Sequence, residues 1–391
     1  MTLITDTKEL AAFCARIAES SFVTVDTEFM RDRTFWPILC LVQIGGPEEA
    51  AAIDPLAPDI DLTPLFELMA DPGVLKVFHA ARQDIEIFVK MAGAVPAPLF
   101  DTQVAAMVCG FGEAASYETL ASRLAGAPID KSSRFTDWAQ RPLTERQLRY
   151  AMADVVPLRA VYEKLAARLQ KTGRASWLDE EMAVLTEVGT YRLDPALAWR
   201  RLKLRSNNRR LLALAQALAE WRETTAQQRD LPRSRVLRDE SLLEIAAHAP
   251  RSAAELARSR GLGKGFAEGK FGTEILAVVE RVLATPESQY PVPPPRRDPP
   301  QGIGPLMDLL RVLLKLRAEE NGVAPRLIAD TEELELLAAD DGAPVKALSG
   351  WRHDLFGRDA LDLKHGRLAL SAAGKRIKLV RLDAPASEAA Q

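Results

Sequence analysis

Apolar and polar positions follow two different patterns along the chain and divide it into two parts. Up to about residue 170, short apolar runs rich in valine and isoleucine alternate with longer amphipathic runs. Short apolar runs are typical of buried strands, and the longer runs are typical of helices. This part therefore predicts an α/β domain. Residues 174–225 have a helical pattern throughout, and strand-like runs are scarce from there to the end, so the remainder is predicted to be helical.

The first part predicts a mixed sheet with flanking helices. Four of its apolar runs have the length of strands, and the last of them leads directly into a helical run. They are FVTVDTEF (22–29), LCLVQIG (39–45), EAAAIDPL (49–56) and LKVFHA (75–80). A long helix is expected over 144–170, because Thr144 and Gln147 have the spacing of a capping box.

The helical part contains a weak internal repeat on either side of a proline-rich linker. LAEWRETTAQQRDLPRSRVLRDESLLEIAA, before the linker, resembles LLKLRAEENGVAPRLIADTEELELLAA, after it. Pro232 and Pro325 hold matching positions at a turn between two helices. The repeat predicts two copies of a small helical bundle, of which the second is more divergent. The linker, over residues 286–302, contains too many prolines for a helix or a sheet.

Composition and charge indicate a globular protein without an overall attraction to nucleic acid. The 391 residues carry 51 basic and 54 acidic side chains, a net charge of −3, so any attraction to phosphate must be local. The three cysteines are widely spaced and predict neither a disulfide framework nor a zinc site. The N-terminus lacks a signal-peptide pattern, and no apolar run approaches the about 18 residues of a membrane span. A cytoplasmic protein is therefore expected.

Two carboxylates at the end of the first predicted strand are the clearest indication of chemistry. Asp26 and Glu28 are separated by one residue, so their side chains point to the same face of a strand, about 6.6 Å apart along it. Like charges this close repel unless cations neutralise them, so the pair predicts a divalent metal site. An acidic strand end in water is the alternative that this stretch alone leaves open.

Three residues further along the chain extend this pattern. Asp84 lies in a helix that begins where a predicted strand ends, at the edge of the sheet where α/β proteins usually hold their sites. Tyr150 and Asp154 are four residues apart and face the same side of a helix, with Cβ atoms about 6 Å apart. Taken singly, Asp84 can also cap its helix or pair with a neighbouring arginine. Tyr150 and Asp154 can form an ordinary half-buried hydrogen-bonded pair.

In combination and in this order, the five residues resemble the three motifs of the DEDD 3′–5′ exonucleases, tyrosine subclass. The stretches around them are similar to bacterial ribonuclease D: DTEFMRDRTFWPILCLVQIG, FDTQVAAMVCG and DKSSRFTDWAQRPLTERQLRYAMADV. LRSNNRRLLALAQALAEWRETTAQQRDLPRSRVLRDESLL resembles the helicase-and-RNase-D C-terminal (HRDC) domain, and LSGWRHDLF resembles the end of the family's second such domain. The resemblance extends over roughly residues 3–365.

The resemblance implies a ribonuclease H-like α/β exonuclease domain, with a mixed five-stranded sheet and flanking helices, followed by two all-α HRDC-type bundles. The implied parts are the exonuclease domain (1–172), a helical connector (173–202), the first HRDC domain (203–285), the proline-rich linker (286–302), a second, divergent HRDC-like domain (303–370) and a tail (371–391).

The implied activity is that of a 3′–5′ exoribonuclease, which trims precursor tRNA and other structured RNAs with two divalent ions, Mg²⁺ or Mn²⁺, and releases 5′-mononucleotides. By resemblance, Asp26 bridges both ions, Glu28 and Asp154 complete the site on the nucleophile side, and Asp84 supports the leaving-group side. Tyr150 aims the attacking water. RNA is the expected partner, and a monomer without an obligate protein partner is expected.

Five further residues are candidates for contact with the substrate. Phe29 can stack on a terminal base, and His79 and Arg141 lie close in sequence to the motifs. Arg209 and Arg210 belong to the basic run WRRLKLRSNNRR, which contains no acid and can hold RNA phosphates. Structural roles stay open for all of them: core packing, a hydrogen-bonded histidine, a salt bridge and a solvated helix face.

Two other sequence features are expected to be structural. Asp101 lies at a strand end, where N-capping of the next helix is the favoured role. The stretch GLGKGFAEGKFG, residues 261–272, fits neither common phosphate-loop pattern and is expected to form a turn between helices.

Two other functions fit part of the sequence. A 3′–5′ DNA exonuclease would use the same motifs, since nothing in them reads a 2′-hydroxyl group. A non-catalytic RNA-binding adaptor would be favoured if an acidic motif residue were missing, but all five motif positions are intact.

Overall fold

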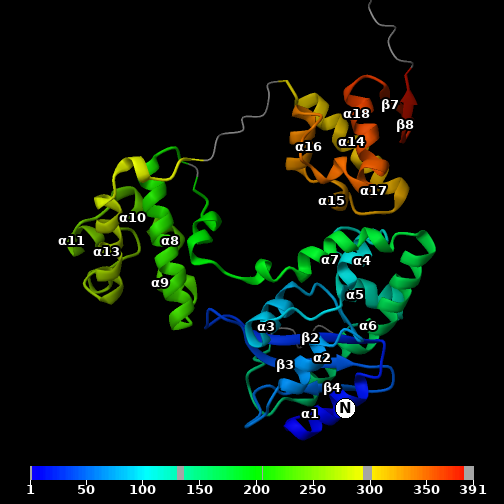
Figure 1. Cartoon of the computed structure of the whole chain (residues 1–391), viewed down its shortest axis with the longest axis horizontal. Coiled ribbons are helices and arrows are strands. Elements are labelled where there is room, and N and C mark those ends of the chain that lie inside the picture. Colours follow the sequence, from blue (N-terminus) through cyan, green and yellow to red (C-terminus); the bar gives the residue numbers. More distant parts are fainter. Residues whose placement is uncertain (1, 130–135, 205, 294–301, 383–391) are drawn as a thin grey trace, which may run out of the picture.

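The computed structural model describes residues 2–129, 136–204, 206–293 and 302–382. It consists of an α/β domain at the N-terminus, a connector of short helices and two helical bundles (Figure 1). Arg205 of the basic run, much of the expected linker and the last nine residues of the expected tail lie outside the described residues. No helix in the described ranges has the length and apolar character needed to cross a lipid bilayer.

The α/β domain is built on one sheet, with strand order β1-β4-β3-β2-β5-β6. The strands are β1 (Thr2–Ile4), β2 (Phe22–Met30), β3 (Ile38–Gly45), β4 (Ala50–Ile53), β5 (Leu75–Phe78) and β6 (Leu99–Asp101). The central strand β2 is antiparallel to β3 and parallel to β5, so the sheet is mixed, as predicted. The prediction of five strands was wrong, because three-residue β1, which pairs with β4, is too short to give a periodic signal.

Helices cover both faces of the sheet, so alternate residues of the central strands are buried on opposite sides. Val23 and Val25 of β2 pack in one core with the first three helices, whereas Leu41 of β3 packs under α6. The helices of this domain are α1 (Thr7–Ile17), α2 (Thr63–Ala70), α3 (Arg82–Ala92), α4 (Thr102–Val108), α5 (Tyr117–Leu120) and α6 (Glu145–Thr172).

Helix α6 lies against β2, β3 and β4 and begins with the predicted capping box. The hydroxyl of Thr144 accepts a hydrogen bond from the Gln147 amide at 3.2 Å, and the Gln147 side chain accepts one from the Thr144 amide at 3.0 Å. The capping-box prediction is confirmed. Farther along the helix, Thr24 of β2 donates its hydroxyl to the carbonyl of Val155 at 2.8 Å, which fixes α6 on the strand that carries Asp26.

The connector was expected to be helical throughout, but it is a series of short helical turns before a long helix. Its elements are turns at 175–177, 188–191 and 195–201, and α7 (Asp179–Thr186). The first bundle follows, with α8 (Arg209–Arg229), α9 (Arg233–Val236), α10 (Asp239–His248), α11 (Ala253–Leu256), α12 (Lys264–Ala267) and α13 (Lys270–Ala284). The glycine-rich stretch 261–272 encloses α12 between two turns, as expected.

The second bundle repeats the helix order of the first. A long helix, a four-residue helix and a third helix follow one another in both, with Pro232 directly before α9 and Pro325 at the start of α15. Its elements are α14 (Gly304–Asn321), α15 (Pro325–Ile328), α16 (Thr331–Ala339), α17 (Gly350–Arg352), α18 (Arg358–Lys364), β7 (Leu368–Ala373) and β8 (Arg376–Arg381). The expectation of an all-α bundle with a tail from residue 371 was wrong, because β7 and β8 form a hairpin there.

The second bundle packs against the α/β domain and the connector, beside α4 and α7 (Figure 1). A Cβ atom on Gly110 would lie 2.6 Å from the carbonyl oxygen of Gly322, so the two backbones approach too closely for any larger residue. Arg352 is fully buried and forms ion pairs with Glu180 and Glu181 of α7. A buried charge of this kind requires its partners, so these pairs tie the bundle to the connector.

The first bundle contacts the loop that follows β2. The carboxylate of Asp230, at the end of α8, accepts hydrogen bonds from the backbone amides of Phe35 and Trp36, each at 3.0 Å. Phe35 is buried against Ala226 and Val236, and the Arg233 guanidinium lies 4.5 Å from its ring centroid. The loop that leaves the Asp26 strand is therefore held by the helical half of the chain.

We expect Asp230→Ala to loosen this contact at a cost of about 1 kcal/mol, since it removes the side-chain acceptor of two amides of this loop. Hydrogen exchange at the amides of residues 35 and 36 should speed up, while exchange within β2 stays slow. Asp230→Asn is the matched control, because asparagine keeps an acceptor oxygen and tolerates the left-handed backbone of this position (φ 49°). Equal exchange rates in the two variants would contradict the assignment.

Candidate metal centre

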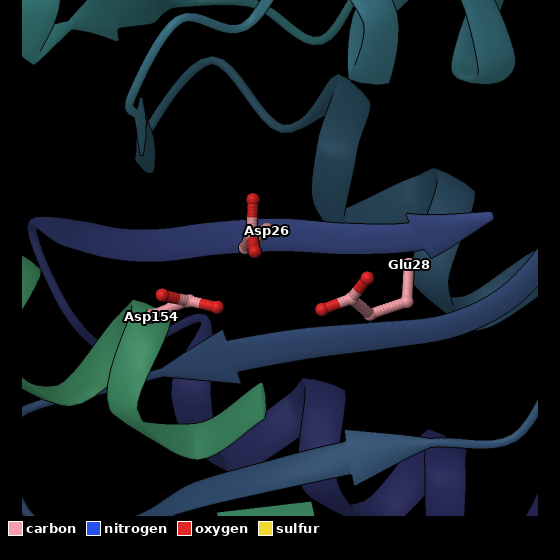
Figure 2. Close-up of side chains that lie close together, drawn as sticks. All are labelled: Asp26, Glu28 and Asp154. Carbon is pink, nitrogen blue, oxygen red and sulfur yellow. The ribbon is translucent and has the colours of Figure 1, made fainter. Parts of the chain in front are cut away.

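Three carboxylates from two elements meet beside the central strand. Asp26 and Glu28 are on β2, two residues apart, and Asp154 is on α6. One oxygen atom from each lies within 4.8 Å of the others, and Figure 2 shows Glu28 and Asp154 directed toward one another next to Asp26. The convergence of Asp26 and Glu28 on one face, predicted from their spacing, is confirmed, and α6 brings Asp154 to the same face.

Burial and mutual repulsion strongly disfavour the ionised forms of these groups. Burial is the main cause that raises the pKa of Asp26 well above its usual range, and the charges of Asp154, Asp84 and Glu28 raise it further. Burial also raises the pKa of Asp154 to about 7. A divalent cation would neutralise this charge, and its preferred ligands are oxygen atoms of this kind. The donor set therefore fits a hard divalent ion such as Mg²⁺ or Mn²⁺.

Asp84 lies beside this cluster but outside the group of three. It occupies the first turn of α3, is buried, and accepts a short hydrogen bond from the hydroxyl of Thr27, the residue between the two carboxylates of β2. Burial raises the pKa of Asp84 to about 7, and the Thr27 hydrogen bond opposes that rise. The structure thus places Asp84 close enough to act electrostatically on Asp26, with its carboxylate anchored by Thr27.

Two contacts fix the helix that carries Asp84. The carboxylate of Asp101 accepts a hydrogen bond from the Gln103 amide at 2.7 Å and so N-caps α4, which confirms the predicted cap. It also accepts hydrogen bonds from the amides of Ala80 and Ala81, at 3.1 and 2.8 Å. These two residues form the turn into α3, and Ala80 has the left-handed backbone that non-glycine residues rarely adopt (φ 59°). The second contact is a two-bond ion pair between Arg31, just beyond β2, and Glu86 of α3.

Tyr150 lies one helical turn before Asp154 on α6. Its ring is half-buried and packs against that of Trp138, with centroids 6.0 Å apart. The i, i+4 spacing directs both side chains toward the same side of α6, as predicted.

Tyr117 is a residue near the site that the sequence did not indicate. Pro157, inside α6, has no amide hydrogen, so the carbonyl of Ala153 loses its usual helical partner. The hydroxyl of Tyr117 donates to this carbonyl at 2.8 Å, directly beside Asp154. Burial raises the pKa of Tyr117, and the charges of Asp154 and Asp26 raise it further, so Tyr117 stays protonated and donates. A proline inside a strongly helical pattern is the sequence signal that points to such an extra donor.

For Arg141 the structure favours the salt-bridge alternative over the phosphate contact. All five N–H groups of its guanidinium are used: two donate to Asp54 at 2.6 Å each, and the others to the carbonyls of Cys40, Trp138 and Gln140. Arg141 instead links the start of the α6 region to strands β3 and β4.

The other candidates for substrate contact have different surroundings. Arg209 donates to the carbonyls of Ser288 and Tyr290 and so closes the first bundle, which argues against the predicted phosphate contact, whereas Arg210 is exposed. His79 is half-buried, with Nδ1 3.0 Å from the hydroxyl of Thr102, and burial lowers its pKa, as for a structural histidine. Phe29 is partly buried against the core, so stacking on a base stays a prediction.

Comparisons with known proteins agree over nearly the whole chain. A family described as 3′–5′ exonuclease matches residues 1–170, and the HRDC domain family matches residues 212–279. Proteins named ribonuclease D from Granulibacter bethesdensis and Acidiphilium cryptum are 52% and 54% identical, over 97% of this chain and 96% and 97% of their own. The crystal structure of Escherichia coli RNase D, described as an exoribonuclease involved in structured RNA processing, is similar with a TM-score of 0.79 and 31% identity, and covers 93% of this chain and 98% of its own.

The raised pKa values predict how pH and metal affect stability. Folded Asp84 and Asp154 bind protons more tightly than the unfolded chain, where aspartate has a pKa of about 3.9. Protonation of these two groups therefore adds to the free energy of unfolding. This stabilisation is complete below about pH 4 and is lost as pH rises through about 7. The Tm of the metal-free protein should therefore be lower at about pH 8 than at about pH 5.5. This decrease should be larger in the wild type than in Asp26→Asn, which carries one fewer acid.

Added Mn²⁺ should raise the Tm of the wild type more at the higher pH, because protons no longer compete with the ion. Scanning calorimetry at both pH values measures both effects, with samples treated with EDTA to remove metal and the same samples after Mn²⁺ is added in excess. A metal-induced increase of equal size in Asp26→Asn would contradict a site centred on these carboxylates.

Proposed function

Since this chain belongs to the ribonuclease D family and is a 3′–5′ exoribonuclease, we propose that it trims the 3′ ends of precursor tRNAs and other structured RNAs. The E. coli relative is described as acting in structured RNA processing, and its similarity to this chain includes the helical half. The products are 5′-mononucleotides. RNA of this kind is processed in the cytoplasm, and the enzyme works there as a monomer.

The cluster of Asp26, Glu28 and Asp154 is the observation that carries this proposal. These carboxylates would hold one divalent ion, and Asp26 with Asp84 would hold a second, both Mg²⁺ or Mn²⁺. Such ions, when bound, make water nucleophilic near neutral pH and stabilise the negative charge on the departing 3′-oxygen. The carboxylates need not react themselves, so no covalent intermediate is required.

The protein's own groups hold and orient the reactants. Tyr150 hydrogen-bonds to the attacking water and aims it at the terminal phosphate. Thr27 keeps the Asp84 carboxylate in place, and Tyr117 stabilises the turn of α6 that carries Asp154.

The helical half holds the body of the RNA. The first bundle contains the matched HRDC domain, and the second, with the same helix order, is a divergent copy of it. Arg210, at the exposed start of α8, contacts phosphate. Because Ala324 and Leu327 of the second bundle share a core with α4 and α6, this bundle is a fixed part of the enzyme and not a tethered module.

Asp26→Asn should abolish hydrolysis while the fold and RNA binding persist, and EDTA should do the same to the wild type, reversibly with Mg²⁺ or Mn²⁺. Release of 5′-mononucleotides from matched 3′-tailed tRNA, single-stranded RNA and single-stranded DNA measures this. The tailed tRNA should be the preferred substrate. Full activity in chelator would exclude the metal mechanism, and preference for DNA would exclude the RNA assignment.

Tyr150→Phe tests the aiming of water, because it removes one hydroxyl and keeps the ring that packs on Trp138. Turnover should fall about 100-fold, as for a misplaced reactant, with Mn²⁺ binding unchanged. Single-turnover kinetics with a short RNA measure the chemical step. An unchanged rate would limit Tyr150 to packing.

Arg210→Glu should weaken binding of tRNA-sized substrates and lower the slope of log K against log salt by about 1, since one phosphate contact is lost. Cleavage of a dinucleotide should be unaffected, because so short a substrate does not reach the bundle. Lys8→Glu, on the exposed side of α1, is the matched charge control. Equal salt slopes for the two variants would remove Arg210 from the RNA path.

A further inference from the structure

Gln43, on β3, has a buried side-chain amide without a hydrogen-bond partner. The residue is 0% exposed, and neither its Oε1 nor its Nε2 has a partner among the described residues. Buried amides are nearly always hydrogen-bonded, because dehydrating them without a partner is unfavourable. An apolar side chain of the same size would pack better at this position, so the amide requires a functional explanation.

The register of the sheet places this amide beside the carboxylates. Gln43 is directly opposite Asp26 in the antiparallel pairing of β2 and β3, and Leu41 is opposite Glu28. Residues paired in this way point to the same face, with Cβ atoms about 4.5–5.5 Å apart. Leu41 is buried under α6, so the row that contains Gln43 faces the helix that carries Asp154.

Thr24, which also belongs to this row, is already engaged. The hydroxyl of Thr24 lies within hydrogen-bond distance of the carbonyls of Val155, at 2.8 Å, and Gly45, at 3.2 Å. The next residue of the row on β2 is Asp26, whose backbone position pairs with that of Gln43, so its carboxylate is the nearest acceptor that the register offers to the Gln43 amide.

We propose that Gln43 is a positioning residue for the metal centre, whose side-chain N–H donates to the ionised carboxylate of Asp26 when a divalent ion is bound. The inference rests on the proposed function, because it requires Asp26 to be a ligand. A carboxylate that binds an ion keeps further lone pairs, and a hydrogen bond to one of them fixes its orientation and increases metal affinity. The Gln43 amide is thus a donor available to the Asp26 carboxylate in the metal-bound protein.

Gln43→Met tests this inference through two effects of opposite sign. The Tm of the metal-free protein should rise, since a flexible apolar side chain replaces an unpaired amide. The affinity for Mn²⁺, measured by calorimetric titration, should fall about 10- to 100-fold. Leu41→Met is the matched control: it places the same side chain on the same strand and face, opposite Glu28, and should leave Mn²⁺ affinity unchanged.

Wild-type affinity for Mn²⁺ in Gln43→Met would overturn the inference, whatever the change in Tm. If Gln43→Met does not fold, Gln43→Leu replaces it: leucine also has no N–H to donate to Asp26, so the affinity should again fall, and an unchanged affinity would overturn the inference. If the wild type and Leu41→Met themselves fail to bind Mn²⁺, the proposed metal centre fails. That outcome differs from a failure confined to the role of Gln43.

Discussion

The gathering of like charges on a buried strand is the constraint on which the rest of this structure depends. Asp26 is at the centre of the sheet, with Glu28, Asp154 and Asp84 close enough to raise its pKa. Such an arrangement weakens the metal-free fold, because burial and repulsion both oppose ionisation. Bound protons or cations relieve this repulsion, and the surrounding structure must hold the acids together against it.

Several contacts around the site supply that resistance, and two of them satisfy backbone groups that would otherwise be unpaired. Asp101 satisfies the amides of the strained turn before α3, and Tyr117 satisfies the carbonyl that Pro157 leaves free in α6. Thr24 ties α6 to the same strand through the carbonyl of Val155. Because these contacts join α3, α6 and β2 to their neighbours, they hold the elements at fixed positions, and the carboxylates on those elements stay converged.

The helical half is joined to the catalytic domain by specific contacts rather than by the chain alone. Asp230 holds the loop after β2, and Arg352 joins the second bundle to α7. Both are charged groups with partners far away in sequence, and losing the partners of Arg352 would leave its buried charge without compensation. These contacts fix the position of both bundles relative to the domain that carries the carboxylates.

The sequence by itself determined the features that depend on local spacing. The D-x-E pair on one strand face, the i, i+4 pair of Tyr150 and Asp154, the capping box at Thr144 and the cap at Asp101 each follow from the period of a single element. Only the tertiary structure decided which distant groups meet. Arg141 was a candidate for phosphate contact or a salt bridge, and its partner is Asp54, 87 positions away; Phe35 meets Asp230 across 195 positions. Gln43 is opposite Asp26 because of strand register, which depends on how the two strands and their turn pack together and not on the period of either strand alone.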